Sequence, residues 1–275
     1  MVVTTYVAPR VARSADRAGP VARTAAVTGR NIVAIRHSAY WLVVVSGFFE
    51  PVLYLFSIGI GVGGLIPSFT LPDGTVLSYR EFVAPGMLAV SAMQGALAEV
   101  AFNFFGRLKW IKLYDAMVAT PLRPFEVAVG ELGWALIRGS VYSVAFLALM
   151  VALGLTTVAW AVPALFAALL TGFAFGGAGM AFSTLMRSWQ DFDYLSTAMF
   201  AMFFFAGTFA PVESFPPALR VVVEWAPLTQ AVELIRGLTT GRPEWSMVVN
   251  VAYLGAMAAV GLFFASRRMQ KLLCP

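Results

Sequence analysis

The sequence predicts an all-α polytopic membrane protein with six transmembrane helices, an N-terminal interfacial helix and a re-entrant outer helical hairpin between spans 5 and 6. Composition is the first observation. Apolar residues form 60% of the 275-residue chain and charged residues only 12%, which is about half the usual charged fraction of a soluble domain. The second observation is a series of long apolar runs, and the third is the uneven placement of Lys and Arg between them.

Six apolar runs are long enough to cross a bilayer, which requires about 20 residues in a helix. Such runs must be helical in lipid because every backbone polar group needs an internal partner. The predicted spans are residues 40–60, 82–105, 134–153, 158–186, 194–210 and 247–265. They divide the chain into a cytosolic basic tail with the interfacial helix (1–39), a transmembrane domain (40–266) and a cytosolic C-terminal tail (267–275).

The placement of positive charge predicts the orientation. With the N-terminus inside, the cytosolic segments hold fourteen of the 19 Lys and Arg residues and the outer segments hold four. This bias follows the positive-inside rule and places both termini in the cytosol. The net charge of +5 is therefore interpreted as a mark of the cytosolic side, with membrane lipids and not nucleic acid as the expected partner.

Residues 21–39 predict a helix on the inner membrane surface. Cationic residues recur there every seven positions and would share one face, which suits a helix with its charges among lipid headgroups. A disordered basic tail is the alternative. The cationic face would hold Arg23, Arg30 and His37, and the opposite face Ala25, Ile32 and Ile35.

Residues 107–124 predict a short amphipathic helix in the first cytosolic loop. Its apolar residues fall at i, i+3, i+4 and i+7, which is one face of a helix. Such a helix either rests on lipid or docks into the groove of a partner, and the pattern alone does not choose between them. The apolar face is formed by Trp110, Leu113, Tyr114 and Met117.

Residues 211–245 predict two short helices on the outside. The pieces 218–225 and 228–238 are too short to span the bilayer and too apolar to sit fully in water. A re-entrant hairpin fits this pattern where protein or water satisfies its backbone. Pro227 is expected to separate the two helices, and Glu233 and Arg236 are expected to pair on the second. The prolines that punctuate the segment are Pro211, Pro216, Pro217, Pro227 and Pro243.

Three charged residues fall inside the predicted spans, namely Glu50, Glu99 and Arg138. Each costs about 2.5–3.5 kcal/mol in the bilayer and should therefore face protein or water. A carboxylate there could carry protons in a secondary transporter. It could instead pair with Arg138 and hold spans together, and we favour this reading because Arg138 lies at a similar depth to Glu99.

The sequence carries no motif for its own ATP hydrolysis. It contains no Gly-Lys pair and hence no Walker A motif. One histidine and one cysteine, Cys274, leave no recognisable zinc pattern. Two G-x-x-x-G pairs, Gly59–Gly63 and Gly172–Gly176, allow close helix packing either within the chain or between chains.

Several local motifs resemble those of the ABC-2 permease family. The stretch Met117-Val-Ala-Thr-Pro-Leu-Arg-Pro124, running on to Gly130-Glu131, resembles the sequence that follows the family's coupling helix. The family's signature region is similar to Phe205-Ala-Gly-Thr-Phe-Ala-Pro211, then residues 215–219, then 225–230, then Arg236-Gly237. The resemblance covers nearly the whole chain and is nearest to the branch of nodulation lipo-oligosaccharide and daunorubicin-type drug exporter permeases.

The resemblance implies a permease subunit of an ATP-driven exporter in the bacterial inner membrane. Two permease chains, identical or homologous, would work with two copies of a separate ABC ATPase. ATP and magnesium would bind to that ATPase, and no cofactor is expected on this chain. The substrate would be amphipathic: a drug, a lipid or a lipid-linked glycan. The alternative is a proton-coupled secondary transporter. The coupling helix would contact the ATPase through Trp110, Leu113, Tyr114, Met117, Thr120 and Pro121.

Overall fold

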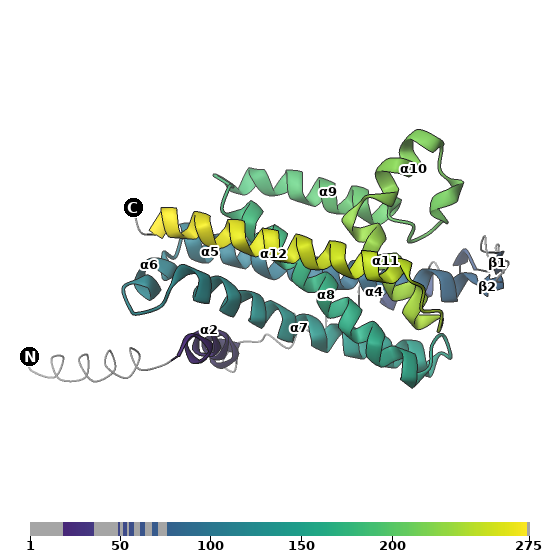
Figure 1. The fold of residues 1–275 in the computed structure, drawn as a ribbon, viewed down its shortest axis with the longest axis horizontal. Coiled ribbons are helices and arrows are strands. Elements are labelled where there is room, and N and C mark those ends of the chain that lie inside the picture. Colours follow the sequence, from purple (N-terminus) through teal and green to yellow (C-terminus); the bar gives the residue numbers. More distant parts are fainter. Residues whose placement is uncertain are drawn as a thin grey trace, which may run out of the picture.

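Four long apolar helices form the body of the molecule and run side by side (Figure 1). The computed structural model describes residues 19–35, 49, 52–53, 55–57, 61–63, 68–70 and 76–273. Within these residues, four helices are long and apolar enough to cross a membrane. They are α4 (Tyr79–Leu97) with its continuations η1 (Ala98–Asn103) and α5 (Phe104–Lys109), α7 (Pro124–Ala152), α8 (Val158–Ser183) and α12 (Ser246–Leu273).

Predicted spans 2, 3, 4 and 6 correspond to these four helices. Span 1, with Glu50 and most of its neighbours, lies outside the described residues, as do His37 and Cys274. Span 5 corresponds to α9 (Phe192–Phe205). Its 14 residues rise about 21 Å at 1.5 Å per residue, less than the hydrocarbon thickness of about 30 Å. The helical class is confirmed, whereas the count of six spans is not.

Helix α8 lies at the centre and packs against α4, α7, α11 and α12. Its glycines make this approach possible. A Cβ on Gly176 would collide with a methyl carbon of Leu132 in α7, and a Cβ on Gly177 would lie 2.9 Å from the Ala258 carbonyl oxygen of α12. The G-x-x-x-G pair at 172–176 therefore serves packing within the chain, which was one of its two predicted uses.

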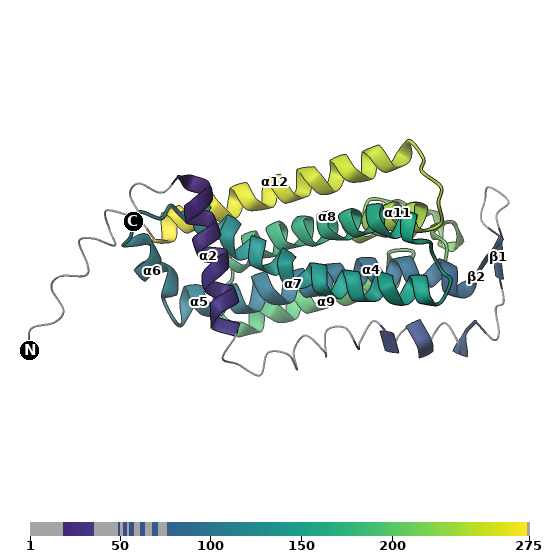
Figure 2. The same ribbon diagram turned by 90° about the horizontal axis from the view of Figure 1, so that it is seen from below.

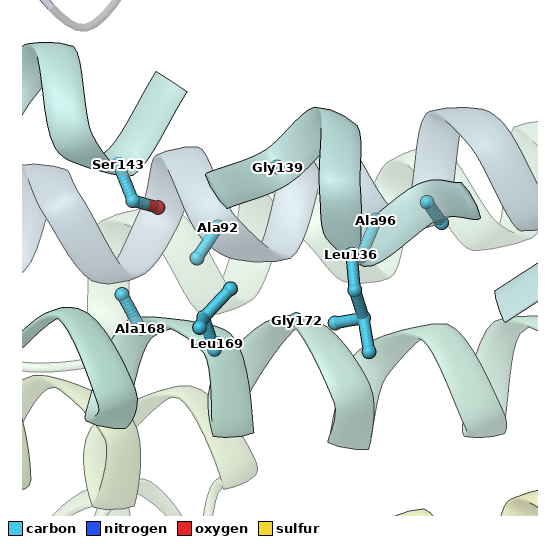
Figure 3. Close-up of a pocket in the computed structure, with 9 residues that line it drawn as sticks. Ala92, Ala96, Leu136, Gly139, Ser143, Ala168, Leu169 and Gly172 are labelled. Carbon is cyan, nitrogen blue, oxygen red and sulfur yellow. The ribbon is translucent and has the colours of Figure 1, made fainter. Parts of the chain in front are cut away.

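Small side chains fill the place where α4, α7 and α8 meet. Figure 3 shows Ala92, Ala96, Ala168 and Gly172 around the cavity there. The cavity measures only about 10 Å³, which is room for one water molecule at most. These three helices therefore leave no passage for a solute between them.

Helix α4 follows a short β-hairpin and begins with a capping box, at the bundle end opposite the C-terminal turn of α12 (Figure 1). Strands β1 (Ser68–Thr70) and β2 (Val76–Ser78) pair antiparallel, an addition to the predicted all-α fold. Ser78 Oγ accepts a hydrogen bond from the Glu81 N–H, and the Glu81 carboxylate accepts one from the Ser78 N–H. This reciprocal pair satisfies two free donors of the first helical turn.

The remaining helices lie at the two ends of the bundle. Helices α2 (Pro20–Ile35) and α6 (Leu113–Val118) lie at the same end as the C-terminal turn of α12 (Figure 1). At the other end, α10 (Pro217–Glu224) is followed by α11 (Pro227–Thr239). Pro227 separates the two helices as predicted, since proline suits the first position of a helix. Two single 3₁₀ turns complete the fold, η2 (Trp189–Asp191) and η3 (Val212–Ser214).

Candidate functional site

A chain of buried ion pairs crosses the bundle end where α2 and α6 lie. Arg138 Nη1 donates to Glu99 Oε2 at 2.6 Å, so the predicted intramembrane pair is present. Arg107 Nη2 lies 3.5 Å from Glu99 Oε1 and its Nη1 pairs with Glu131. Arg30 continues the chain, 3.1 Å from Glu131 Oε1. Glu99 and Glu131 are each only 2% exposed, so neither charge relies on solvent.

A π-helical turn presents Glu99 to these partners. The turn η1 interrupts the helix that begins as α4, and Asn103 Nδ2 donates to Glu99 Oε2 at 2.8 Å. Such turns are rare and frequently occur at functional positions. The carboxylate is held by groups from its own helix and from α7, which fits the structural reading of Glu99 better than a proton carrier.

The N-terminal helix α2 is fastened to α7 by polar contacts. Arg23 donates from Nε and Nη2 to Glu126 Oε1 at 3.0 and 2.7 Å. Thr28 Oγ1 donates to the Gly130 carbonyl oxygen at 2.9 Å, and Asn31 Nδ2 to Glu131 Oε2 at 3.1 Å. Figure 2 shows α2 lying across the bundle instead of along it.

The helical prediction for this segment is confirmed over residues 20–35, and Arg23 and Arg30 share one face as predicted, but the environment predicted for that face is wrong. Arg23 and Arg30 face carboxylates of α7 and not lipid headgroups. Glu126 and Glu131, each at most 3% exposed, were missed as their partners. The available signal was two carboxylates five residues apart in an apolar stretch, since buried charges need partners.

The loop after α5, which was predicted to be cytosolic, is divided into two parts. Helix α5 ends at Lys109 and α6 begins at Leu113, because Lys112 adopts a left-handed conformation with φ of 50°. Trp110 is 66% exposed, whereas Tyr114 is fully buried with its ring 5.0 Å from that of Phe104. The single apolar face predicted across 110–117 is therefore wrong, since the break changes the helical register between Trp110 and Tyr114.

The other residues of this loop that were predicted to contact a partner also differ in their exposure. Leu113, Met117 and Pro121 are half-buried, and Thr120 is exposed. Burial raises the pKa of the Tyr114 hydroxyl well above its ordinary value, so the group stays protonated. Of the predicted contact residues, Trp110 and Thr120 are exposed, and so is Ile111, the apolar neighbour of Trp110. We refer to Trp110 and Ile111 as the loop tip.

A second cluster gathers the distant signature residues at the opposite end. Arg236 of α11 donates to the carbonyl oxygens of Gly207 and Phe82 at 2.7 and 3.3 Å, and its guanidinium lies 3.9 Å from the Phe82 ring centroid. Burial lowers the pKa of Arg236 to about 10, which leaves it charged at neutral pH. Among the described contacts, these groups replace the predicted ion pair with Glu233.

Backbone requirements explain other residues of this cluster. Gly207 has φ of 70°, a conformation that favours glycine. A Cβ on Gly86 of α4 would lie 2.9 Å from a Thr208 methyl carbon, so the loop presses closely on α4. Pro211 and Pro216 each stand directly before a short helix, η3 and α10. No group of three or more potential metal ligands occurs in the described part of the chain.

The sequence profile of the ABC-2 type transporter family matches residues 23–240. The chain belongs to this family. The matched region of this ABC-2 chain runs from α2 to the end of α11, and it contains the ion pairs, the loop tip and the Arg236 cluster. The resemblance noted in the sequence is thereby confirmed.

Named relatives of this ABC-2 chain are membrane transport proteins or nodulation proteins. Nodulation protein J of Rhizobium leguminosarum bv. viciae is 30% identical over 233 residues, covering 83% of this chain and 86% of that protein. Nodulation protein J of Rhizobium meliloti (strain 1021) is 28% identical over 251 residues, covering 91% and 94%. The inner membrane transport permease YadH of Escherichia coli (strain K12) is 27% identical over 172 residues, covering 61% and 65%. This ABC-2 chain is thus a transport permease and not an ATPase.

Proposed function

We propose that this chain is the transmembrane subunit of an ATP-driven exporter that moves an amphipathic substrate out of the cytoplasm. A drug, a lipid or a lipid-linked glycan fits this class. Family membership supports the transport role. The proposed coupling role rests on the loop tip. This exposed apolar pair directly follows α5, and Arg107 of α5 belongs to the buried ion pairs.

The loop tip has the composition of a docking site for the ATPase. Trp110 and Ile111 are 66% and 69% exposed and lie between Lys109 and Lys112, which are also exposed. Tryptophan surrounded by polar residues is typical of energetically dominant interface positions. A force on the tip would act on α5, where Arg107 pairs with Glu131 of α7 and with Glu99. The neighbouring spans would then move together.

The substrate path is proposed to lie between two copies of the permease. The tight packing of α4, α7 and α8 supports this, since their shared cavity of about 10 Å³ excludes a solute. Each exporter would contain two permease chains, identical or homologous, and two ATPase chains that bind ATP and magnesium. The excess of Lys and Arg in alternate loops supports an inner-membrane location with both termini in the cytosol.

Replacement of Trp110 by alanine tests the coupling role. Loss of a buried interface tryptophan costs about 2–4 kcal/mol, which weakens association by roughly 30- to 1000-fold. Trp110→Ala should therefore remove most of the ATPase from the purified complex while the permease itself elutes normally in size exclusion. Trp245→Ala is the matched control, because Trp245 is 90% exposed and lies near the outer end of α12. Normal ATPase recovery with Trp110→Ala would contradict the docking role.

The ion pairs of Glu99 weigh against the proton-coupled alternative, because two arginines already hold that carboxylate. Glu50 lies outside the described residues, so its role is tested by substitution. Glu50→Gln should retain transport if the carboxylate only packs or pairs. Transport that depends on a pH gradient and continues without ATP would overturn the proposed exporter.

A further inference from the structure

A groove lies between the first turn of α7 and the C-terminal half of α12. Its volume is about 760 Å³, within the range of roughly 300–1,000 Å³ typical of ligand sites. Two arginines, Arg123 and Arg267, line it together with Phe125, Leu262 and Phe263, and no acidic residue of the described chain does so. The groove therefore combines positive charge with an apolar wall.

The two arginines differ from those of the buried network. Arg23, Arg30, Arg107 and Arg138 each pair with a carboxylate. Among the described ion pairs, Arg123 and Arg267 take part in none. Glu126, the acidic residue nearest in sequence to Arg123, is occupied by Arg23 and by the Arg123 backbone N–H. No carboxylate of the described residues therefore neutralises Arg123 or Arg267, and both guanidinium groups are open to an anion.

The apolar wall of the groove is also uncovered. Phe125 and Phe263 are each 54% exposed. The Arg267 guanidinium lies 4.9 Å from the Phe263 ring centroid, an arrangement that fixes the cation beside the apolar surface. Its N–H groups remain available to an anion.

Both arginines lie at ends of membrane-spanning helices, on the same end of the bundle as α2 and α6 (Figure 1). In a bilayer, the ends of spanning helices meet the headgroup region and the residues deeper in the helices meet acyl chains. Basic pockets between transmembrane helices are suited to anionic headgroups. We propose that the groove binds an anionic phospholipid, with its phosphate between Arg123 and Arg267 and its acyl chains along Phe125 and Phe263. This goes beyond the proposed function and does not depend on coupling to an ATPase.

The test measures binding of dioleoyl phosphatidylglycerol to the full-length chain in detergent by native mass spectrometry. One cation near a lipid phosphate contributes about 1 kcal/mol, or about a fivefold change in affinity. Arg123→Gln and Arg267→Gln should each raise the Kd about fivefold, and the double variant about thirtyfold. Arg268→Gln is the matched control, because Arg268 is the next residue of α12 and does not line the groove.

Four further measurements separate a phospholipid site from a phosphate site, from an interface between copies and from misfolding. Phosphatidylcholine should bind more weakly than phosphatidylglycerol, and inorganic phosphate at millimolar concentration should not displace the lipid. Arg123→Lys with Arg267→Lys should retain most of the binding, which would exclude misfolding as the cause of the loss. An unchanged Kd in the double glutamine variant, or an equal loss in Arg268→Gln, would overturn the proposal. Displacement of the lipid by inorganic phosphate would also overturn the proposal. A change of oligomeric mass in the glutamine variants, at unchanged lipid affinity, would overturn it as well and would assign the groove to an interface with a second copy of the chain.

Discussion

At the scale of single residues, Glu131 joins three helices. Its carboxylate lies in α7 and receives hydrogen bonds from Arg30 and Asn31 of α2 and from Arg107 at the end of α5. A buried carboxylate is costly unless its neighbours compensate it. The position therefore has a structural role that its place in an apolar helix did not suggest.

Glu131→Gln should destabilise the permease strongly. Removal of one partner from a buried ion pair costs about 3–5 kcal/mol. Here Arg30 would lose its described carboxylate partner, whereas Arg107 would keep Glu99. Thermal unfolding in detergent should show a clear fall in Tm. Glu224→Gln provides the control, since Glu224 pairs with Arg220 on an exposed face of α10 and its replacement should leave Tm unchanged. Equal Tm values for the two variants would contradict the role assigned to Glu131.

Gly130 makes the close contact between α2 and α7 possible. A Cβ at this position would lie 2.6 Å from Val27 Cβ and 3.0 Å from the Thr24 carbonyl oxygen. Gly130→Ala should therefore cost about 1–3 kcal/mol through overpacking and should lower the Tm measured by thermal unfolding in detergent.

Gly139→Ala is the control for Gly130→Ala on the same helix, because a Cβ there meets no atom within 4 Å. Alanine should stabilise the helix at this position by about 0.5–1 kcal/mol. A destabilisation as large as that of Gly130→Ala would show that the contact with Val27 is not the cause.

At the scale of elements, some contacts between helices could be predicted from the sequence and others could not. The pair Glu99–Arg138 could be predicted because both charges fall at one depth in neighbouring spans. The partners of Glu126 and Glu131 could not, since they lie about 100 positions earlier in a separate helix. Periodicity also failed at Lys112, whose positive φ is uncommon for a residue other than glycine.

The helices at the bundle end opposite α2 and α6 also combine a feature that could be predicted with one that could not. Proline placement was sufficient to predict the boundary between α10 and α11. It was not sufficient to predict that Arg236 would bind backbone carbonyls of Phe82 and Gly207 in place of Glu233. That choice depends on how the loop at Gly207 folds against α4, and sequence spacing does not contain this information.

At the scale of the whole molecule, the orientation in the membrane remains a prediction from charge placement. Cysteines at Ser214, just before α10, and at Ala119, directly after α6, test it. Both positions are exposed, and α10 and α6 lie at opposite ends of the bundle (Figure 1). The native Cys274 is first replaced by serine. An impermeant maleimide added to intact cells should label Ser214→Cys, and should label Ala119→Cys only after the cells are permeabilised. The reverse pattern would invert the topology.

The close meeting of α4, α7 and α8 has a consequence for protein engineering. If the substrate path runs between two copies of the permease, the residues packed inside each bundle determine the thermal stability of the protein. The residues on the surface between the two bundles then determine which substrate is carried. Substitutions that fill the small gap beside Ala92 and Gly172 could then raise thermal tolerance without altering which compounds are carried. Durability and selectivity could be optimised separately in this permease.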